Sequence, residues 1–356
     1  MSDDDVLGTY PMDPASRRVT IDDVARTANV SIGTVSKVIN GRRGIGEDTR
    51  ARVEAVADSL GYVSVFERRG SLRSVGEPTI EVLVEPADVA NPYLSLFMGG
   101  AMEIAGSLGA GLLMRSIESI QNLPRAAWAQ SLVRAGRVGV IEVTSAFSAD
   151  RENALRAVGL PMVLVDPIDR PRKSTPSIGA TNWAGAYEAT QYLISLGHNR
   201  VAYVGGPPRA TCDVIRAHGW AAAMTDAGLP ADLDAVLRHS YTFEHGRDAA
   251  ERLLGAELPP TAIFAGSDIS AMGVLEAARR CGLQVPRDLS VVGFDDTYLA
   301  RTSTPPLTTV HQPIADIGRN AVSSVMRLAG GDPLPAKRIE LATHLVVRDS
   351  TAPPRP

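Results

Sequence analysis

The sequence is poor in the residues and segments that mark several classes of protein. Only two cysteines, Cys212 and Cys281, occur among 356 residues, which is too few for a disulfide framework or a cysteine-based metal site. No apolar run approaches the roughly 18 residues that a membrane span needs, and the acidic start, Met1–Asp5, lacks the apolar core of a secretory signal. We therefore expect a protein of the reducing cytoplasm with no membrane partner.

Motifs for catalysis or cofactor binding are also scarce. The segment Gly205-Gly206-Pro207-Pro208 is rich in glycine but lacks the Lys-Ser/Thr of a phosphate-binding loop. His239 and His245 lack the spacing of metal ligands, and we find neither a nucleophile elbow nor a Cys-His pair at a catalytic spacing. We therefore expect no enzyme activity, no cofactor and no metal.

Charged residues are unevenly distributed along the chain, whose net charge is −4. Residues 1–16 hold four aspartates and no base, residues 17–73 hold 11 bases and 7 acids, and residues 74–356 hold 25 bases and 29 acids. A basic segment ahead of a long acidic one suggests a phosphate-contacting module attached to a larger part. The length and the hydrophobic content of 44% fit two or three globular domains, preceded by a disordered acidic tail over 1–17.

Residues 18–62 have the pattern of three short helices. The stretch Thr20–Asp23 is a capping box for the first helix, and Asn29 tolerates the left-handed backbone of a tight turn. Ser31 can cap the second helix, and apolar spacing predicts a third over 47–60. Two short helices joined by a tight turn and braced by a third are the plan of a helix-turn-helix DNA-binding domain. A three-helix domain that binds protein, or that serves only packing, is the alternative.

The second helix of this domain is the expected reader of the DNA groove. Its hydroxyl and amide groups can reach phosphates, Lys37 can donate to a guanine edge, and Ile32 can contact a thymine methyl. The residues that we expect to contact double-stranded DNA are Thr20, Ser31, Ile32, Gly33, Thr34, Ser36, Lys37 and Asn40.

The same domain contains a long series of short sequence motifs in a characteristic order. They are Val19–Ala25, Val30-Ser31, Thr34–Gly41, Thr49-Arg50 and Leu60–Tyr62. The series resembles the DNA-binding domain of the lac-repressor/galactose-repressor (LacI/GalR) family. The resemblance implies a sequence-specific transcriptional regulator, a repressor, that binds a near-palindromic operator as a homodimer. Gly33 stands where a base-reading side chain is usual, which shifts direct readout towards Ile32 and Lys37.

Residues 63–78 form a basic linker. In the family this stretch is a short hinge helix that inserts a leucine into the minor groove, and the resemblance implies Leu72 as that wedge and Arg69 as a phosphate contact. The usual Pro-Asn is absent and Gly70 weakens a helix, so an ordinary flexible linker is the alternative.

From Ile80 onward, short runs rich in β-branched residues alternate with stretches of helical periodicity. Candidate strands lie at 80–84, 112–115, 138–143, 162–165, 200–204, 262–265 and 289–294. Candidate helices lie at 94–108, 123–135, 183–196, 215–227, 243–254, 267–281 and 314–328. This alternation predicts parallel sheets with helices on both faces, and the number of elements predicts two similar lobes. A ligand would bind between the lobes, beyond the carboxyl ends of the strands.

Polar and aromatic residues stand just past several of these strand ends. Arg216 and Asp295 form a notable pair, because a guanidinium facing a carboxylate can bridge adjacent hydroxyl groups of a polyhydroxylated ligand. Tyr93 or Tyr241 could stack on the apolar face of a sugar. Two further carboxylates suit helix caps or turns as well as ligand contacts: Asp268 and Asp296.

These segments also match the effector-binding core of the same family. The matching stretches are Asn91–Tyr93, Leu196–Ala202, Arg216 with Gly219-Trp220, Ser290–Asp296 and Pro305–Pro313. Together with the helix-turn-helix domain, the resemblance covers about residues 18–350. It implies a two-lobed α/β core with parallel sheets, similar to periplasmic sugar-binding proteins. It implies a small effector, a sugar or sugar-like molecule, between the lobes. The expected effector contacts are Asn91, Tyr93, Asn182, Arg216, Tyr241, Ser267, Asp295 and Gln312.

The resemblance also sets the expected domain boundaries. The N-terminal lobe covers 79–180 and 312–335, the C-terminal lobe covers 181–311 and 336–350, and a disordered tail covers 351–356. Two positions depart from the family pattern, since Ser267 replaces an asparagine and Thr181 replaces an aspartate. Both changes reduce the polar lining and argue against a standard hexose.

Two other classes use such a core. A solute-binding or sensor protein without DNA regulation is the alternative, but the helical head and the missing signal oppose it. An enzyme would need an acid–base or nucleophile constellation that we do not find. We expect a dimer that pairs through 94–108 and 123–135. Some family members join two dimers through a leucine-rich C-terminal helix, but the proline-rich end, Thr351–Pro356, cannot form such a helix. We therefore expect a dimer and not a tetramer.

Overall fold

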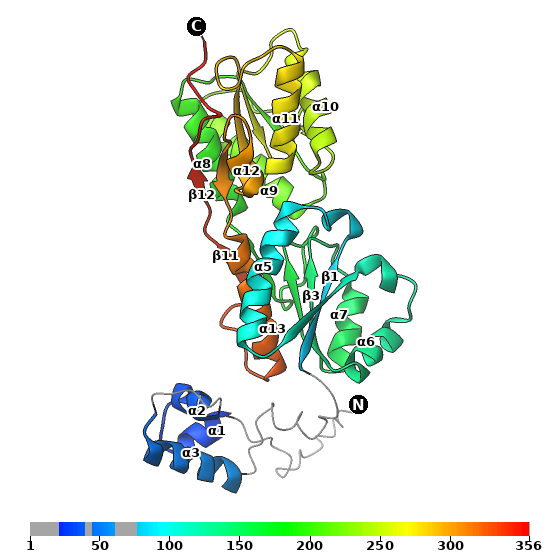
Figure 1. Cartoon of the computed structure of the whole chain (residues 1–356), viewed down its shortest axis with the longest axis vertical. Helices are drawn as coiled ribbons and strands as arrows, with labels where there is room; N and C mark the ends of the chain where they lie inside the picture. Colours follow the sequence, from blue (N-terminus) through cyan, green and yellow to red (C-terminus); the bar gives the residue numbers. More distant parts are fainter. Residues whose placement is uncertain (1–20, 40–44, 61–76, 356) are drawn as a thin grey trace, which may run out of the picture. The chain divides into compact units, whose positions relative to one another are not determined.

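The computed structural model describes residues 21–39, 45–60 and 77–355. They belong to two compact units, Met1–Val75 and Gly76–Pro356, which we call the head and the core and describe separately (Figure 1). Among the described residues, we find no helix with the length and apolar character needed to span a bilayer. The expected acidic tail and the linker residues 63–76 lie outside the described residues.

The described part of the head contains the three helices that the sequence predicts. They are α1 (Ile21–Thr27), α2 (Ile32–Ile39) and α3 (Glu47–Ser59). Asn29, in the turn between α1 and α2, has a positive φ of 53° as expected. The Ser31 hydroxyl accepts a hydrogen bond of 3.1 Å from the backbone amide of Thr34 and so caps α2. In the described part of the head, the buried core consists of small and medium-sized apolar residues: Val24, Ala25, Ala28, Val35, Val38, Val53 and Ala57.

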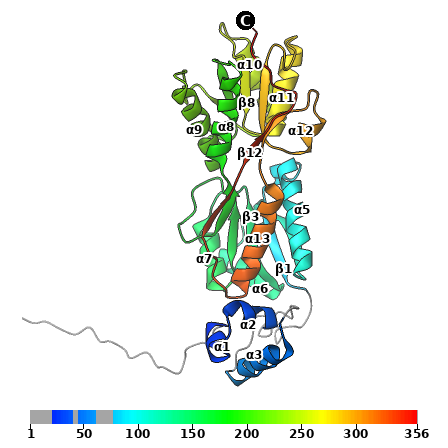
Figure 2. The same ribbon diagram turned by 90° about the vertical axis from the view of Figure 1, so that its left-hand side faces the viewer.

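The N-terminal lobe of the core is built on a parallel sheet with the strand order β11-β5-β4-β3-β1-β2. The strands are β1 (Thr79–Val84), β2 (Gly111–Ser116), β3 (Arg137–Val143), β4 (Met162–Val165), β5 (Ser177–Ala180) and β11 (Arg338–Leu341). Helices α5 (Pro92–Ser107) and α13 (Ile314–Ala329) cover one face, and α6 (Arg125–Arg134) and α7 (Ala149–Ala157) cover the other (Figure 1, Figure 2). Short 3-10 helices, η2 (Pro86–Asp88) and η3 (Ile117–Ile120), follow β1 and β2.

The C-terminal lobe repeats this plan with the order β12-β10-β9-β8-β6-β7. The strands are β6 (Val201–Gly205), β7 (Leu237–Arg238), β8 (Ala262–Ala265), β9 (Ser290–Asp295), β10 (Thr308–His311) and the antiparallel edge strand β12 (His344–Val346). Helices α8 (Asn182–Ser195) and α9 (Thr211–Asp226) cover one face, and α10 (Phe243–Leu254) and α11 (Asp268–Arg280) cover the other. The short helix α12 (Tyr298–Thr302) follows β9.

The two sheets share one strand order, β2-β1-β3-β4-β5 in one lobe and β7-β6-β8-β9-β10 in the other, which confirms the prediction of two similar lobes. Within residues 77–355 the chain passes between the lobes three times, at 181, at 312–313 and at 342–343. The inner strands β4, β8 and β9 are buried along their whole length, so the open carboxyl ends of the strands are where polar side chains can gather.

Two predicted boundaries near the end of the chain are wrong. The prediction assigns 336–350 to the C-terminal lobe, but β11 pairs with β5 in the N-terminal lobe. Its alternating exposed and half-buried residues give no continuous apolar signal. The prediction also makes 351–356 disordered, whereas the Ala352 amide and carbonyl bond the Ser290 hydroxyl at 3.0 and 2.9 Å. A polar, proline-rich tail is thus held by hydrogen bonds that its composition does not reveal.

Glycines allow the two helices on one face of the N-terminal lobe to approach closely. A Cβ atom added to Gly100 of α5 would lie 1.9 Å from the carbonyl oxygen of Ala315 in α13. A Cβ atom on Gly318 of α13 would lie 2.2 Å from the carbonyl oxygen of Phe97. The backbones therefore touch at these points, and the packing of α13, which arrives from the other lobe, depends on them.

This contact generates a prediction with an adjacent control. Gly100→Ala should destabilise the core by about 1–3 kcal/mol or more, because the backbones must separate. Gly99→Ala, on the open side of the same helix with nothing within 4 Å of its Cβ position, should stabilise by about 0.5–1 kcal/mol. Urea unfolding of the three proteins measures both effects. Equal effects of the two substitutions would contradict the close packing.

Candidate ligand-binding site in the core

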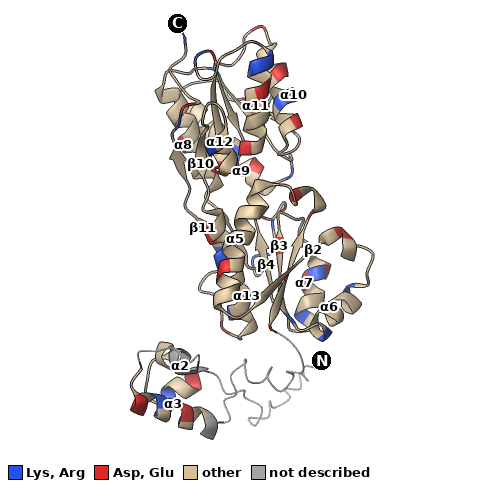
Figure 3. Cartoon of the chain, viewed as in Figure 1, with Lys and Arg blue, Asp and Glu red and all other residues tan. Residues whose placement is uncertain are grey.

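Glu276, Arg279 and Arg280 form ion pairs with partly exposed side chains on α11, a helix that carries several charged residues (Figure 3). Arg216 and Asp295 differ, since only 4% and 7% of their surface is exposed. Buried charges persist when they are paired and hydrogen-bonded. Their surroundings therefore define a polar centre inside the core.

The guanidinium of Arg216, on α9, is held on several sides. Its Nε donates to Oδ1 of Asn182 at 2.7 Å, and its Nη1 donates to the carbonyl oxygen of Gly266 at 2.6 Å. Its Nη1 also lies 3.9 Å from Oδ1 of Asp295. The guanidinium carbon is 3.7 Å from the centre of the Phe294 ring, a cation–π contact. The centre thus contains Asn182, Arg216 and Asp295, as the sequence predicts.

Gln312 completes the polar centre. Its Nε2 donates to Oδ1 of Asp295 at 2.6 Å, while its buried Oε1 has no hydrogen-bond partner among the described residues. An unsatisfied buried acceptor costs about 1–3 kcal/mol. A ligand hydroxyl would remove that cost, so the centre offers an open acceptor beside a carboxylate and a guanidinium.

Burial dominates the electrostatics of Asp295. It raises the pKa of this carboxyl from 3.8 to about 6, against the lowering effects of Arg216 and Gln312. Burial and the nearby Asp295 also raise the pKa of Asp268. Both carboxyls therefore lose their protons less readily than exposed carboxyls do.

Asp268 and Asp296 serve the structure of the lobe. Asp268 accepts hydrogen bonds from the amide and hydroxyl of Thr297, at 2.6 and 2.9 Å, and from the Thr309 hydroxyl at 2.6 Å. Asp296 pairs with Arg348 at 2.5 Å and with His311 at 3.0 Å. Both carboxylates are thus engaged by groups of the chain itself.

Two predicted contacts act as helix caps. The Asn91 side chain accepts a hydrogen bond of 3.0 Å from the amide of Tyr93 at the start of α5. The Ser267 hydroxyl accepts one of 3.3 Å from the amide of Ser270 at the start of α11. Ser267 still borders the polar centre, because it directly follows Gly266.

The N-terminal lobe contributes a residue that the sequence analysis missed. The Tyr93 hydroxyl donates to the carboxylate of Asp166, which directly follows β4, and burial raises the pKa of both groups. Asp166 has a φ of 41°, and Asp295 has one of 116°. Such backbone strain clusters at functional sites. The rule that found Asp295, a polar residue just past a strand, applies equally to Asp166.

The two lobes are also directly hydrogen-bonded. The amide and the hydroxyl of Thr211, at the start of α9, both donate to the carbonyl oxygen of Ile168 in the N-terminal lobe, at 2.7 and 2.9 Å. Arg216 lies on the same helix. Any change in the angle between the lobes therefore acts on the helix that carries the guanidinium.

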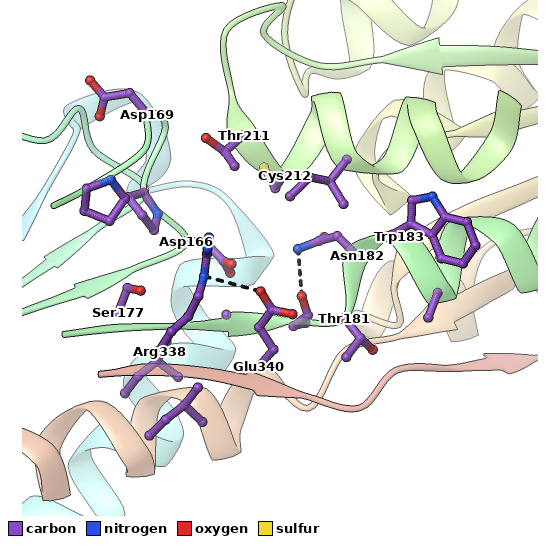
Figure 4. Close-up of a pocket in the computed structure, with 18 residues that line it drawn as sticks. Asp166, Asp169, Ser177, Thr181, Asn182, Trp183, Thr211, Cys212, Arg338 and Glu340 are labelled. Atoms are coloured by element: carbon purple, nitrogen blue, oxygen red, sulfur yellow. Dashed lines mark hydrogen bonds and ion pairs between the residues drawn. The ribbon is translucent and has the colours of Figure 1, made fainter. Parts of the chain in front are cut away.

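A cavity of about 250 Å³ opens between the lobes beside the polar centre (Figure 4). Asp166, Asn182, Thr211 and Cys212 are among its lining residues. Asn182 belongs both to this lining and to the polar centre, since its amide oxygen binds Arg216. Burial raises the pKa of the Cys212 thiol to about 11. Cys212 therefore lines the cavity as a neutral thiol and not as a reactive thiolate.

The predicted DNA contacts are only partly covered by the described residues. Ser31, Ile32 and Gly33 are exposed at the start of α2, and Thr34 is half-buried. Ser36 and Lys37 belong to α2, and their side chains are not described. The predicted contacts outside the described residues are Thr20, Asn40, Arg69 and Leu72.

The pKa of Asp295 generates a prediction about stability. Because the folded chain holds this proton more tightly than the unfolded chain, the free energy of unfolding should fall as pH rises from 3.8 to about 6. Asp295→Asn should remove a contribution of about 3 kcal/mol to that fall. Urea unfolding between pH 4 and 7 measures it, with the exposed Asp226→Asn as control. An unchanged slope in Asp295→Asn would contradict the raised pKa.

Comparisons with known proteins show the family to which both parts of the chain are similar. The family described as "Bacterial regulatory proteins, lacI family" matches residues 20–64, and the "Periplasmic binding protein-like domain" matches residues 190–351. The HTH-type transcriptional regulator DegA of Bacillus subtilis (strain 168) is 33% identical over 340 residues, which cover 94% of this chain and 99% of DegA.

Two solved structures are similar over the whole length. The transcriptional regulator CelR–cellobiose complex has a TM-score of 0.69 at 29% identity, and the lac repressor dimer bound to operator and the anti-inducer ONPF has one of 0.66 at 25% identity. Each match covers 94% of this chain and all of the other chain. The chain belongs to the LacI family and is a helix-turn-helix transcriptional regulator, not an enzyme.

Proposed function

We propose that this regulator is a repressor that binds a near-palindromic operator as a homodimer in the cytoplasm. We further propose that a small carbohydrate, bound between the lobes, controls its affinity for the operator. The observation that carries the second proposal is the polar centre. There Arg216 and Asp295 are buried together with the Gln312 oxygen that has no hydrogen-bond partner within the described ranges.

The chemistry of the polar centre favours a neutral polyhydroxylated ligand. A hydroxyl group both donates and accepts, so two adjacent hydroxyls can donate one to Gln312 Oε1 and one to Asp295 while accepting from Arg216. The nearby carboxylate of Asp166 adds negative charge and disfavours a phosphorylated ligand. The cellobiose bound to the similar regulator CelR supports the same class.

The position of the polar centre suggests how a ligand would act on the lobes. Asn182 and Gln312 lie at two of the points where the chain passes between the lobes. A ligand that contacts them would prefer one lobe arrangement over the other, and only such a difference in affinity can shift the equilibrium. The head opposes a purely solute-binding role, because solute binding does not need it.

Lys37 is the proposed reader of a base edge in the operator. Lys37→Ala should weaken binding to an operator selected from a random duplex library by about 1–3 kcal/mol and relax base preference at one position in each half-site. Binding to random duplex should change much less. Fluorescence anisotropy at fixed salt measures both affinities. If both duplexes bound the variant as tightly as the parent, Lys37 would not read a base.

Asp295 is the proposed ligand anchor. Asp295→Ala should abolish the response of operator binding to sugars that move the parent, because loss of a buried charged partner typically costs about 2–5 kcal/mol. Operator binding without sugar should persist, since the head is a separate unit. The test titrates operator complexes with ribose, glucose and cellobiose. A variant that responded at the parent's sugar concentration would remove Asp295 from the site.

The proposed dimer rests on exposed apolar side chains in the predicted pairing segments. Met102 of α5 is 62% exposed, and Val133 of α6 is 48% exposed. Such surfaces mark protein contacts when they gather into a patch. Sedimentation at micromolar concentration should show a dimer, and Met102→Glu should shift it towards monomer. A parent that sedimented as a monomer or as a tetramer would contradict the proposal.

A further inference from the structure

Asp213, in the first turn of α9, is a fully buried carboxylate surrounded by hydrogen-bond donors. Its Oδ1 accepts from the Tyr203 hydroxyl at 2.8 Å, the Gly206 amide at 2.6 Å and the Tyr241 hydroxyl at 3.1 Å. Its Oδ2 accepts from Nε of Arg238 at 2.7 Å. One side chain thus ties together β6, β7, the loop after each of them, and α9.

The glycine pair at the end of β6 allows this convergence. A Cβ atom on Gly205 would lie 2.9 Å from Oδ1 of Asp213, and one on Gly206 would lie 2.4 Å from the Tyr241 ring. A Cβ atom on Gly266 would lie 2.9 Å from the same ring. The Tyr241 ring therefore packs against the backbone at both Gly206 and Gly266. The glycine-rich segment at Gly205-Gly206 is not a phosphate-binding loop. Its missing side chains leave the space that Asp213 and the Tyr241 ring occupy.

The Tyr241 ring lies beside the polar centre. The guanidinium carbon of Arg216 lies 5.6 Å from the centre of the Tyr241 ring. Gly266, where an added Cβ atom would meet the ring, also provides the carbonyl oxygen that accepts from Arg216 Nη1. Asp213 and Arg216 are also one helical turn apart on α9, so they are adjacent on its surface.

We propose that Asp213 is a positioning residue for ligand recognition. It holds Tyr241 against Gly206 and Gly266 and so fixes the aromatic wall beside Arg216. This inference rests on the proposed function, since it concerns the same ligand site. A carboxylate is required because three donors on one oxygen and a guanidinium on the other need four acceptor sites, which a neutral side chain lacks.

The wall sets the shape of the site and therefore its selectivity. With the Tyr241 hydroxyl tied down, the ring presents one fixed apolar surface, on which the C–H face of a sugar ring can lie. Without Asp213, the hydroxyl loses a buried acceptor, and the ring and the Gly206 loop lose their common anchor. The effect should reach ligands through Tyr241, and operator binding in the absence of ligand should not change.

A double-mutant cycle tests this link. The variants are Asp213→Asn, Tyr241→Phe and the double variant, with cellobiose as the probe of operator release. We expect each single variant to raise the half-effective cellobiose concentration at least tenfold. The double variant should raise it no further than the larger single effect, because both changes break one link. Operator affinity without sugar should stay within twofold of the parent.

Asp226→Asn is the matched control. Asp226 also lies on α9 and also accepts a hydrogen bond from a tyrosine hydroxyl, that of Tyr187 at 2.8 Å, but on the outer surface. It should leave the cellobiose response unchanged. If Asp213→Asn behaved like this control, or if the two effects multiplied in the double variant, the positioning role would be wrong.

A measurement without sugar separates this inference from the proposed function. The same four proteins are unfolded in urea, and the coupling of Asp213 and Tyr241 should change the unfolding equilibrium constant at least fivefold beyond additivity. A parent that ignored cellobiose and other sugars would contradict the proposed function while leaving this coupling measurable. Additive unfolding effects would overturn the link between Asp213 and Tyr241 whatever the sugar response.

Discussion

The buried guanidinium of Arg216 is the constraint on which the proposed ligand site depends. Taking such a charge out of water costs several kcal/mol, so it must find partners on all sides. It finds them on α8 through Asn182, after β8 through Gly266, and at the end of β9 through Asp295. These segments meet because parallel strands end at one edge of a sheet. The fold of the C-terminal lobe thus brings together the groups that pair with the guanidinium of Arg216.

The same arrangement connects the site to motion of the lobes. Gln312 binds Asp295 and also lies where the chain passes from β10 into α13, which packs in the other lobe. Thr211, at the start of the helix that carries Arg216, donates to the carbonyl oxygen of Ile168 across the lobes. A ligand in the polar centre would therefore touch groups that a change in the lobe angle would move. Allosteric coupling of about 1–3 kcal/mol needs only modest differences in such contacts.

Much of this could be predicted from the sequence, and the exceptions have physical causes. The head, the lobes and the cluster of Arg216, Asp295 and Gln312 follow from helical spacing, buried strands and matched motifs. The strands β7, β11 and β12 are short or exposed edges, which lack a buried apolar pattern. The role of Asp213 depends on long-range contacts with Tyr241 and Arg238, which no local pattern encodes. The cap function of Ser267 competes with its predicted ligand role for one hydroxyl.

The central claim is that ligand binding in the core and operator binding by the head share one coupling free energy. Calorimetric titration of the sugar that releases the operator, with and without saturating operator duplex, tests it most directly. Linkage requires that the operator change the dissociation constant of the sugar by the same factor by which the sugar changes that of the operator. We predict equal factors of about 5 to 150. Identical sugar affinity with and without operator would contradict the account.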